Sequence, residues 1–578
     1  MMKYELNLSM EELEKRTHKD YLTTKKMLEI ESEEYEKLLD GDKEALAHLV
    51  KAGDILEKIN KQLDNSHNLP FEKYLNIEIK NGNKQAELTK ILYDAQKGLC
   101  AIDRETQIIE LAKGVSETLG KGVYPEDMGV EEFHSIILKM LKSEKITEVK
   151  TILNQRSFVE RNGDELIGTD YIDKFKEDFC LMADELEKAS KVSSNADFNE
   201  YLILQAKALR TADPMLDAYA DVKWAKLQDT PLEFTITREN YSDELTETVI
   251  ENEELKSLLE QYGITPIAKD FLGGRVGIVN KKGTEALLKV KDFLPLMAQN
   301  MPFNDEYVQN ISPDAESKQT MVDVDLVMVS GDVGAFRAGI TLAENLPNDD
   351  KLSISIGGGR RNVYHRQIRL ITSEDAKKKM QERLDAMLDK QQHKFYNDEA
   401  DHWFTIGHEN GHSLGPNSGT EALGKYKSTI EENKADMVSL SMVDALTEAG
   451  MYTEDERLQI IVTYATDNML KSKPTLSQAH RVRSVMQNYY FLKEGAISIS
   501  EEGVLSINIE KMVPTAKKML KEIVRVQIDG DFSKGEKYVL DNFVWTKEMD
   551  AMAENLKRIS KILNGTVESK LADKLLNE

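Results

Sequence analysis

Residues 405–416 read TIGHENGHSLGP, and this stretch predicts a helix with an unusual set of side chains. His408 and His412 are four positions apart, so on a helix both imidazoles lie on one face and can converge on one metal ion. Glu409 lies about 100° round the helix from His408, near such an ion without binding it. A base that takes a proton from a metal-held water must occupy that position.

The residues around this motif favour a functional helix over a chance match on a charged one. Gly415 and Pro416 are expected to end the helix soon after His412. Gly411 lies inside the helix, where glycine costs about 1 kcal/mol relative to alanine. A destabilising residue at that point indicates close packing or the close approach of a substrate.

A catalytic zinc site needs a third protein ligand and one open position. The segment TIEENKADMVSL, residues 429–440, offers Glu432, twenty positions after His412 on another helical pattern. Asp436 lies four residues further, on the same helix face, where its carboxylate can accept the N–H of a zinc-bound imidazole. Glu431 is the rival ligand, or otherwise an outer partner of the site. We therefore predict one Zn²⁺ per chain, held by His408, His412 and Glu432.

Together these motifs resemble the dipeptidyl peptidase III family of zinc peptidases. That family pairs an HE…H helix with a later EExxA(E/D) helix, as HENGH and EENKAD do here. The five-residue form of the first motif is similar to the shorter bacterial branch, which reads HELSHGLGP. The resemblance extends to further segments, which read KGVYPEDM (121–128), DVKWAKLQDTPLEFTITRENYSDE (221–244), RAGITLAENLPNDD (337–350) and LSQAHRVRSV (476–485). The first 70 residues or so match least.

The resemblance implies roles for residues in both halves of the chain. His480 matches a histidine that stabilises the transition state, and an imidazolium could hydrogen-bond a developing oxyanion. The alternative for His480 is a buried structural histidine. Asn345 and Asn348 match asparagines that bind the peptide backbone, to which an amide offers both a donor and an acceptor. The alternative for this pair is turn chemistry in the sequence ENLPND.

The same resemblance assigns two residues near the middle of the chain. Tyr241 matches a tyrosine close to the reacting carbonyl, and Glu239 matches a glutamate that holds the ammonium of the peptide. Residues 251–264, ENEELKSLLEQYGI, depart from the family pattern and read as an insertion.

Composition excludes several classes of protein. The formal net charge of −26 disfavours binding to nucleic acid and to anionic membranes. No apolar run approaches the 18–20 or so residues that a membrane span needs, and the N-terminus has no signal-peptide pattern. Cys100 and Cys180 form no disulfide framework and fit a reducing compartment, so we expect a cytoplasmic protein. The sequence leaves the oligomeric state open.

Element patterns predict an α+β fold. Residues 1–65, 84–119 and 165–225 read as helices, and the chain after Ser373 is mainly helical. Between them lie stretches with strand-like alternation and β-branched residues, which are LEFTITREN (232–240), VGIVNKKGT (276–284), VDVDLVMVSGDV (322–333) and KLSISIGGG (351–359).

We therefore predict two lobes with a cleft between them. A lower lobe of mixed strands and helices would comprise residues 1–280, with 318–365 returning to it. An upper helical lobe with the zinc would comprise residues 281–317 and 366–578.

The predicted function is zinc-dependent hydrolysis of short oligopeptides, with release of N-terminal dipeptides implied by the resemblance. One alternative is a zinc aminopeptidase or endopeptidase with products of another length. A second is a peptide-binding protein without turnover, against which the presence of Glu409 argues, because a pure binder needs no base beside the metal.

Overall fold

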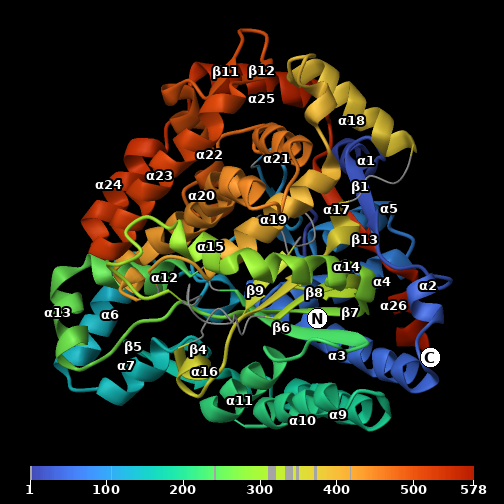
Figure 1. Cartoon of the computed structure of the whole chain (residues 1–578). Coiled ribbons are helices and arrows are strands. Elements are labelled where there is room, and N and C mark those ends of the chain that lie inside the picture. Colours follow the sequence, from blue (N-terminus) through green and yellow to red (C-terminus); the bar gives the residue numbers. More distant parts are fainter. Residues whose placement is uncertain are drawn as a thin grey trace.

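The computed structural model describes residues 3–105, 107–211, 213–239, 243–309, 320–331, 343–346, 351–369, 374–416 and 418–578. In this part of the chain, helices predominate over small sheets, so the predicted α+β class is confirmed. Figure 1 shows the largest sheet across the middle of the molecule, with the helix that carries the HENGH motif and its neighbours above it and a row of helices along the bottom.

The largest sheet has five strands in the order β6-β7-β8-β10-β9. They are β6 (Leu232–Glu239), β7 (Phe271–Asn280), β8 (Thr320–Ser330), β10 (Arg361–Tyr364) and β9 (Ala343–Leu346), and only β8 and β10 run parallel. Arg275 of β7 forms an ion pair of 2.9 Å with Glu344 of β9, although two strands separate them. Ile236 of β6 and Leu346 of β9 also line one pocket. The sheet therefore curls, and its two edge strands approach each other.

Helices cover the sheet with a large hydrophobic core. Helix α3 (Asp40–Asp64) packs on β7 with an apolar stripe that includes Leu49, Leu56 and Ile59, all fully buried. Further out lie α9 (Lys176–Val192), α10 (Ala196–Leu209) and α11 (Pro214–Trp224), the three helices at the bottom of Figure 1.

A second large core is built mainly from the C-terminal half. It gathers the helices α19 (Asp398–His412), α20 (Lys427–Glu448), α21 (Glu454–Asp467), α22 (Ala479–Glu494) and α23 (Ile509–Asp529). Helix α20 is buried along most of its length and packs against α19, α22 and α23. The metal-motif helix α19, which carries HENGH, therefore belongs to this second core. It also contacts strands β9 and β10 of the sheet.

The end of the chain returns to the first core. Strand β13 (Asn564–Glu568) pairs in parallel with β1 (Leu22–Lys26), and Leu571 and Leu575 of α26 (Lys570–Asn577) pack in the core around the sheet. The prediction placed all of residues 366–578 in the upper lobe, and this terminal segment departs from it. The other lobe boundaries stay a prediction.

Several local predictions need correction. The stretch 165–225, predicted as helices, begins with a strand, β5 (Glu165–Asp170), which pairs with β4 (Ser157–Asn162). The strand predicted over 276–284 ends at Asn280, where α14 (Lys281–Leu288) begins. Residues 1–65 contain the strand β1 between the helices α1 (Met10–Thr17) and α3, and residues 84–119 contain a hairpin of β2 (Cys100–Ile102) and β3 (Ile108–Glu110) after α5 (Lys84–Gln96). The segment 351–359 begins with a short helix, α16 (Lys351–Ser355), in place of a strand. That segment packs against α11, whereas β9 and β10 on either side of it already occupy the sheet edge.

The segment 251–264, read as an insertion, has a regular structure. It contains the helix α13 (Glu253–Gln261), whose N-cap Asn252 accepts a hydrogen bond from the backbone of Leu255. Leu255 and Leu259 lie in the first core. The insertion is therefore packed onto the lower lobe.

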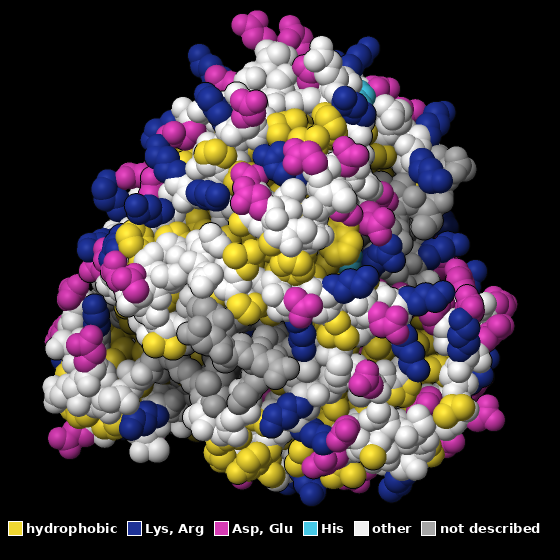
Figure 2. Space-filling view, in the orientation of Figure 1, with side chains coloured by type: hydrophobic (Ala, Val, Ile, Leu, Met, Phe, Trp, Pro, Cys, Tyr) yellow, Lys and Arg dark blue, Asp and Glu magenta, His cyan; other side chains and the backbone are white. Residues whose placement is uncertain are grey.

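The surface carries charges of both signs. On the face in Figure 2, Lys and Arg side chains are interspersed with Asp and Glu among the described residues. In the described part of the chain, no helix combines the length and the apolar character that a membrane crossing requires.

Candidate metal centre

Helix α19 carries the first motif and is held very close to α20. It begins after Asn397, whose side chain accepts the backbone N–H of Glu399, and it ends at His412. A Cβ atom on Gly407 would lie 2.3 Å from Ser439 Oγ, and one on Gly411 would lie 2.9 Å from the carbonyl oxygen of Ala435. Both glycines thus allow the two helices to touch, and this close crossing explains the glycine inside the motif.

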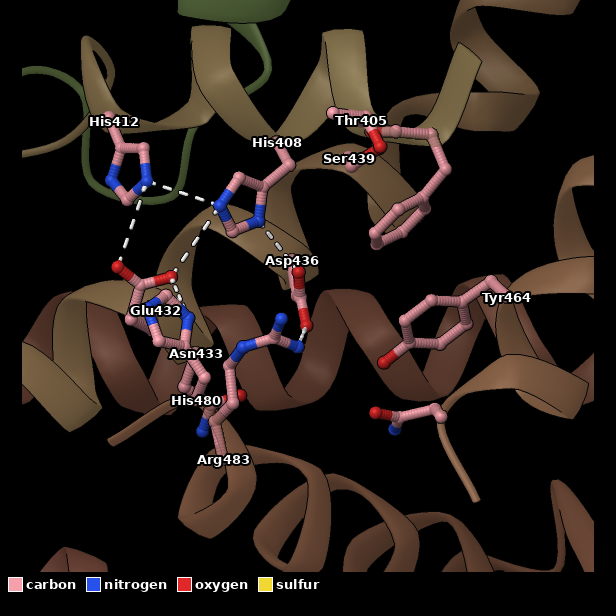
Figure 3. A network of polar contacts seen from close by, with 12 residues as sticks. Thr405, His408, His412, Glu432, Asn433, Asp436, Ser439, Tyr464, His480 and Arg483 are labelled. Carbon is pink, nitrogen blue, oxygen red and sulfur yellow. Dashed lines mark hydrogen bonds and ion pairs between the residues drawn. The ribbon is translucent and has the colours of Figure 1, made fainter. Parts of the chain in front are cut away.

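The crossing brings together three side chains that could hold a metal ion (Figure 3). The Nε2 atoms of His408 and His412 are 3.2 Å apart. The carboxylate of Glu432 on α20 lies 3.5 Å from His408 Nε2 and 4.0 Å from His412 Nε2. One ligand atom from each residue lies within 4.8 Å of the other two. The predicted trio therefore converges on one point.

Carboxylates on the outer side of each imidazole fix which nitrogen carries the proton. His408 Nδ1 lies 2.7 Å from Asp436 Oδ1, and His412 Nδ1 lies 3.0 Å from Glu431 Oε1. Because an ionised carboxylate only accepts, each Nδ1 is the donor and each Nε2 of a neutral ring carries a lone pair.

This donor set fits a divalent cation. Two lone pairs that face each other at 3.2 Å cannot form a hydrogen bond, and the Glu432 carboxylate adds negative charge at the same point. Two imidazoles and one carboxylate match the ligand set of catalytic zinc sites, which keep a fourth position open. The residues present therefore suit Zn²⁺.

Burial and neighbouring charges set the ionisation of the group. Burial lowers the pKa of His408 to about 3, so this imidazole is neutral and available as a ligand. Burial alone would raise the pKa of Glu432, but the neighbouring His480, by its charge and its hydrogen bond, contributes most to an opposing effect that holds the pKa well below its usual range. Glu432 is therefore an ionised carboxylate at neutral pH.

Glu409 is buried beside this group. Burial, with a smaller contribution from the charges of Glu432 and Glu344, raises the pKa of Glu409 to about 8. A nearby divalent cation would favour the ionised form and lower this pKa. A cation at the site would therefore bring the pKa of Glu409 closer to neutral pH, which suits a general base.

His480 lies beside the three ligand residues and is partly exposed to solvent. It is the second residue of α22, and its Nδ1 atom lies 3.1 Å from Glu432 Oε2. Its side chain is 45% exposed, so it is reached from solvent as well as from the ligand group. This exposure does not fit the alternative of a buried structural histidine.

Residues that the sequence interpretation did not single out hold the two outer carboxylates. Arg483 and Gln487 of α22 donate to Asp436 Oδ2. Lys434 contacts Glu431 Oε1 at 2.7 Å, and Gln527 of α23 donates to Glu431 Oε2 at 2.8 Å. Arg483 lies one helical turn after His480, and this spacing was the available signal; nothing in the sequence links Gln527 to the site.

The predicted peptide-binding residues are only partly described. Tyr241 and Asn348 lie outside the described residues, and Glu239 ends β6 with a side chain that is also outside them. Asn345 lies on β9 and is 6% exposed. Its amide donates to Asn362 and Ser413 and accepts from Arg360, whereas the prediction expected an amide that faces a peptide.

Comparison with solved structures identifies the fold. Dipeptidyl peptidase III from Caldithrix abyssi is similar over 97% of this chain and all of its own, with a TM-score of 0.75 and 21% identity. Dipeptidyl-peptidase III from Corallococcus sp. strain EGB is similar over 98% of both chains, with a TM-score of 0.77 and 19% identity. No family model and no curated protein matches the sequence. At these identities the likeness establishes that this chain has the two-lobed fold of those structures.

Proposed function

We propose that this protein is a zinc-dependent peptidase that removes dipeptides from the N-terminus of short peptides. The convergence of His408, His412 and Glu432, with the buried carboxyl group of Glu409 beside them, carries the proposal. A zinc ion bound there would act as a Lewis acid and lower the pKa of its water to about 7.

The side chains around the ligands supply the remaining steps. Glu409 accepts a proton from the attacking water and then donates it to the leaving amine. His480, whose ring is partly exposed next to Glu432, donates a hydrogen bond to the carbonyl oxygen as negative charge develops on it. Tyr241 is assigned to the same oxygen on the basis of the family resemblance.

The edge strand β9 supports the assignment of a peptide as the substrate. Among the described strands, β9 pairs only with β10 and lies at the end of the sheet, and we propose that an extended peptide adds to its other edge. Glu344 of this strand contributes to the raised pKa of Glu409, so the strand and the base are within electrostatic reach of each other. A peptide added to β9 would therefore run past the metal site.

Release of dipeptides requires a fixed anchor for the ammonium group of the peptide. We assign that role to Glu239, at the end of β6, and a backbone contact to Asn348, which follows β9. The two edge strands approach each other where Ile236, Arg238 and Leu346 line one pocket. A carboxylate at the end of β6 would then lie near the end of a peptide bound along β9.

The decisive test of the chemistry is the Glu409→Gln variant. The amide keeps the shape of the side chain but cannot act as a base, so turnover should be abolished while the protein keeps about one zinc per chain. Zinc is measured by atomic emission and turnover by mass spectrometry of a peptide mixture. Near-normal turnover in the zinc-loaded variant would rule out the proposed role of Glu409.

The test of product length compares a free hexapeptide with its N-acetylated form. Acetylation removes the ammonium charge, and a charge-assisted hydrogen bond is worth about 1.5–3 kcal/mol. Cleavage of the acetylated peptide should therefore fall by on the order of 10- to 100-fold in kcat/KM, and the first product from the free peptide should be a dipeptide. Equal cleavage of both, or initial release of single residues, would contradict the dipeptidyl assignment and leave the metal site standing.

A further inference from the structure

A chain of buried amides joins the edge strand of the sheet to the metal-motif helix. Asn345 of β9 lies directly opposite Asn362 of β10 in the antiparallel pair, and the side-chain Nδ2 of Asn345 donates to Oδ1 of Asn362. The Asn362 amide in turn donates to Asn410 Oδ1 at 3.2 Å. Asn410 lies in the middle of HENGH, between the two metal-binding histidines. The three side chains link β9, β10 and α19 across the boundary between the two large cores.

The three asparagine side chains form several hydrogen bonds, and they are shielded from water. Asn410 Nδ2 donates to the carbonyl oxygen of Ile406 at 2.9 Å, and Asn362 Nδ2 donates to the hydroxyl of Tyr364 at 2.9 Å. Asn345 Nδ2 also reaches Ser413 Oγ at 3.3 Å, just beyond the end of α19. Asn362 and Asn410 have no exposed surface. A buried amide group left unpaired destabilises the protein, so the network favours one relative position of strand and helix.

Helix geometry separates the metal-binding side of α19 from the side that meets the sheet. His408 and His412 point to α20, where their partners Glu432, Asp436 and Glu431 lie. Asn410 is two residues from each histidine and therefore lies on the opposite face of the helix, towards β10. The same five-residue motif thus fixes the metal on one side and the sheet edge on the other.

We propose that Asn362 and Asn410 are positioning residues that set the register of strand β9 against the metal site and thereby set product length. This inference rests on the proposed function. An extended peptide advances by about 3.3 Å per residue along a strand. A shift of β9 by a fraction of that step would misalign the scissile bond, and a shift of one step would present another bond. Asn345 belongs to this network as its end on the edge strand.

The variants Asn410→Leu and Asn362→Leu test the proposal, because leucine keeps the branched shape of the side chain and cannot form the hydrogen bonds. Asn542→Leu is a matched control: Asn542 of α24 (Phe532–Asn542) is buried and donates to the carbonyl oxygen of Tyr538, four residues earlier at 2.9 Å, as Asn410 does with Ile406. The control has the same local bond, to a carbonyl of its own helix.

We expect both test variants to keep about one zinc per chain. Their kcat/KM on a free hexapeptide should fall by on the order of 10- to 100-fold, the range that a misplacement of about 1 Å produces. Mass spectrometry should show single residues and tripeptides beside the dipeptide, whereas the control should release dipeptides alone. The double variant of Asn362 and Asn410 should be no worse than the poorer single variant, since both changes interrupt one chain.

Each other outcome overturns a defined part of this reasoning. Unchanged product length and kcat/KM in the folded Asn410→Leu variant would refute the positioning role. Loss of zinc in that variant would also refute it, because Asn410 would then support the metal helix itself. If a leucine variant fails to fold, the serine variant at the same position is tested instead, and the same outcomes refute the proposal. A wild-type protein that binds zinc and cleaves no peptide would instead refute the proposed function.

Discussion

The two imidazoles of the candidate metal site have outer partners in contrasting surroundings. Asp436, behind His408, has a side chain with 0% exposure, whereas Glu431, behind His412, is 28% exposed. Asp436 is held by an arginine and a glutamine of α22, and Glu431 by a lysine one turn along its own helix and a glutamine of α23. The first carboxylate is enclosed by protein and the second is reached by water.

This contrast has an energetic consequence. When a partner of a fully buried group is removed, the group left behind pays the full cost of desolvation. Water can replace a lost partner at a half-exposed position, so the cost there is smaller. We therefore expect His408 to depend more strongly on its outer carboxylate than His412 does. We expect the loss of zinc affinity to be largest for changes of the ligand Glu432, smaller for changes of the two outer carboxylates, and smallest for changes of the residues that hold those carboxylates.

The largest effect should come from the ligand itself. Glu432→Ala removes one of three protein ligands and should give protein without bound zinc, while Glu431→Ala should keep most of its metal. Both residues are adjacent on α20, but only the Glu432 carboxylate faces both Nε2 atoms. Zinc content after gel filtration distinguishes the two variants. A metal-free Glu431→Ala protein beside a zinc-loaded Glu432→Ala protein would reverse the assignment.

The next effect compares the two outer carboxylates with matched amides. Asp436→Asn should weaken zinc binding by roughly 10- to 100-fold, the range for the loss of an outer carboxylate partner. The loss of zinc affinity in Glu431→Gln should lie at or below the lower end of that range, because solvent reaches the side chain of Glu431. Competition with a chelator measures both values of Kd. Equal losses would show that burial does not decide the strength of these contacts.

A smaller effect should follow from Arg483→Met. Asp436 would lose one cationic partner and keep His408 and Gln487, so zinc affinity should fall by less than in Asp436→Asn. Arg483 acts through Asp436, and the same change should therefore have little further effect in the Asp436→Asn background. The four Kd values form a double-mutant cycle. Additive losses would mean that Arg483 acts on the site by another route.

The sequence predicts the two helices of the candidate site better than it predicts the edge of the sheet beside them. The four-residue spacings in HENGH and EENKAD fix faces of two helices, and the structure places those side chains together at the positions the spacing predicted. Local periodicity suffices there, because the helix itself determines which residues share a face. The spacing from Glu432 to Asp436 likewise favoured Glu432 over its rival Glu431, and the structure groups Glu432 with the two histidines.

The sheet edge could not be predicted in the same way. The contact between Asn362 and Asn410 joins residues 48 positions apart, and β1 pairs with β13 from the other end of the chain. Such pairings depend on tertiary packing, which no local pattern records. Residues 351–355 show the same limit, because the alternating sequence LSIS suits a strand and yet forms a helix against α11.

The smallest expected effect compares Gln487→Leu with Gln527→Leu, the same substitution on the two sides of the site. Gln487 is fully buried: its Nε2 donates to Asp436 and Asn433 at 3.0 Å, and its Oε1 accepts from Tyr464 and Asn468. Gln527 is also buried, and its Nε2 donates to Glu431. Its Oε1 has no hydrogen-bond partner in the described part of the chain.

Leucine at position 487 would leave the Tyr464 hydroxyl without its acceptor, take one of two acceptors from Asn468 Nδ2 and remove one donor from Asp436, so both stability and zinc affinity should decrease. The free energy of unfolding should fall by about 1–3 kcal/mol or more, the cost of buried groups without partners. Leucine at position 527 removes one hydrogen bond and also removes an unpaired oxygen, so its effect on stability should be at most about 1 kcal/mol. Zinc affinity should change by a few-fold at position 487 and less at position 527. Urea unfolding of the zinc-free proteins and chelator competition measure the two quantities separately. If Gln527→Leu proved the more damaging of the two, enclosure of the Asp436 side would no longer explain the difference between the imidazoles.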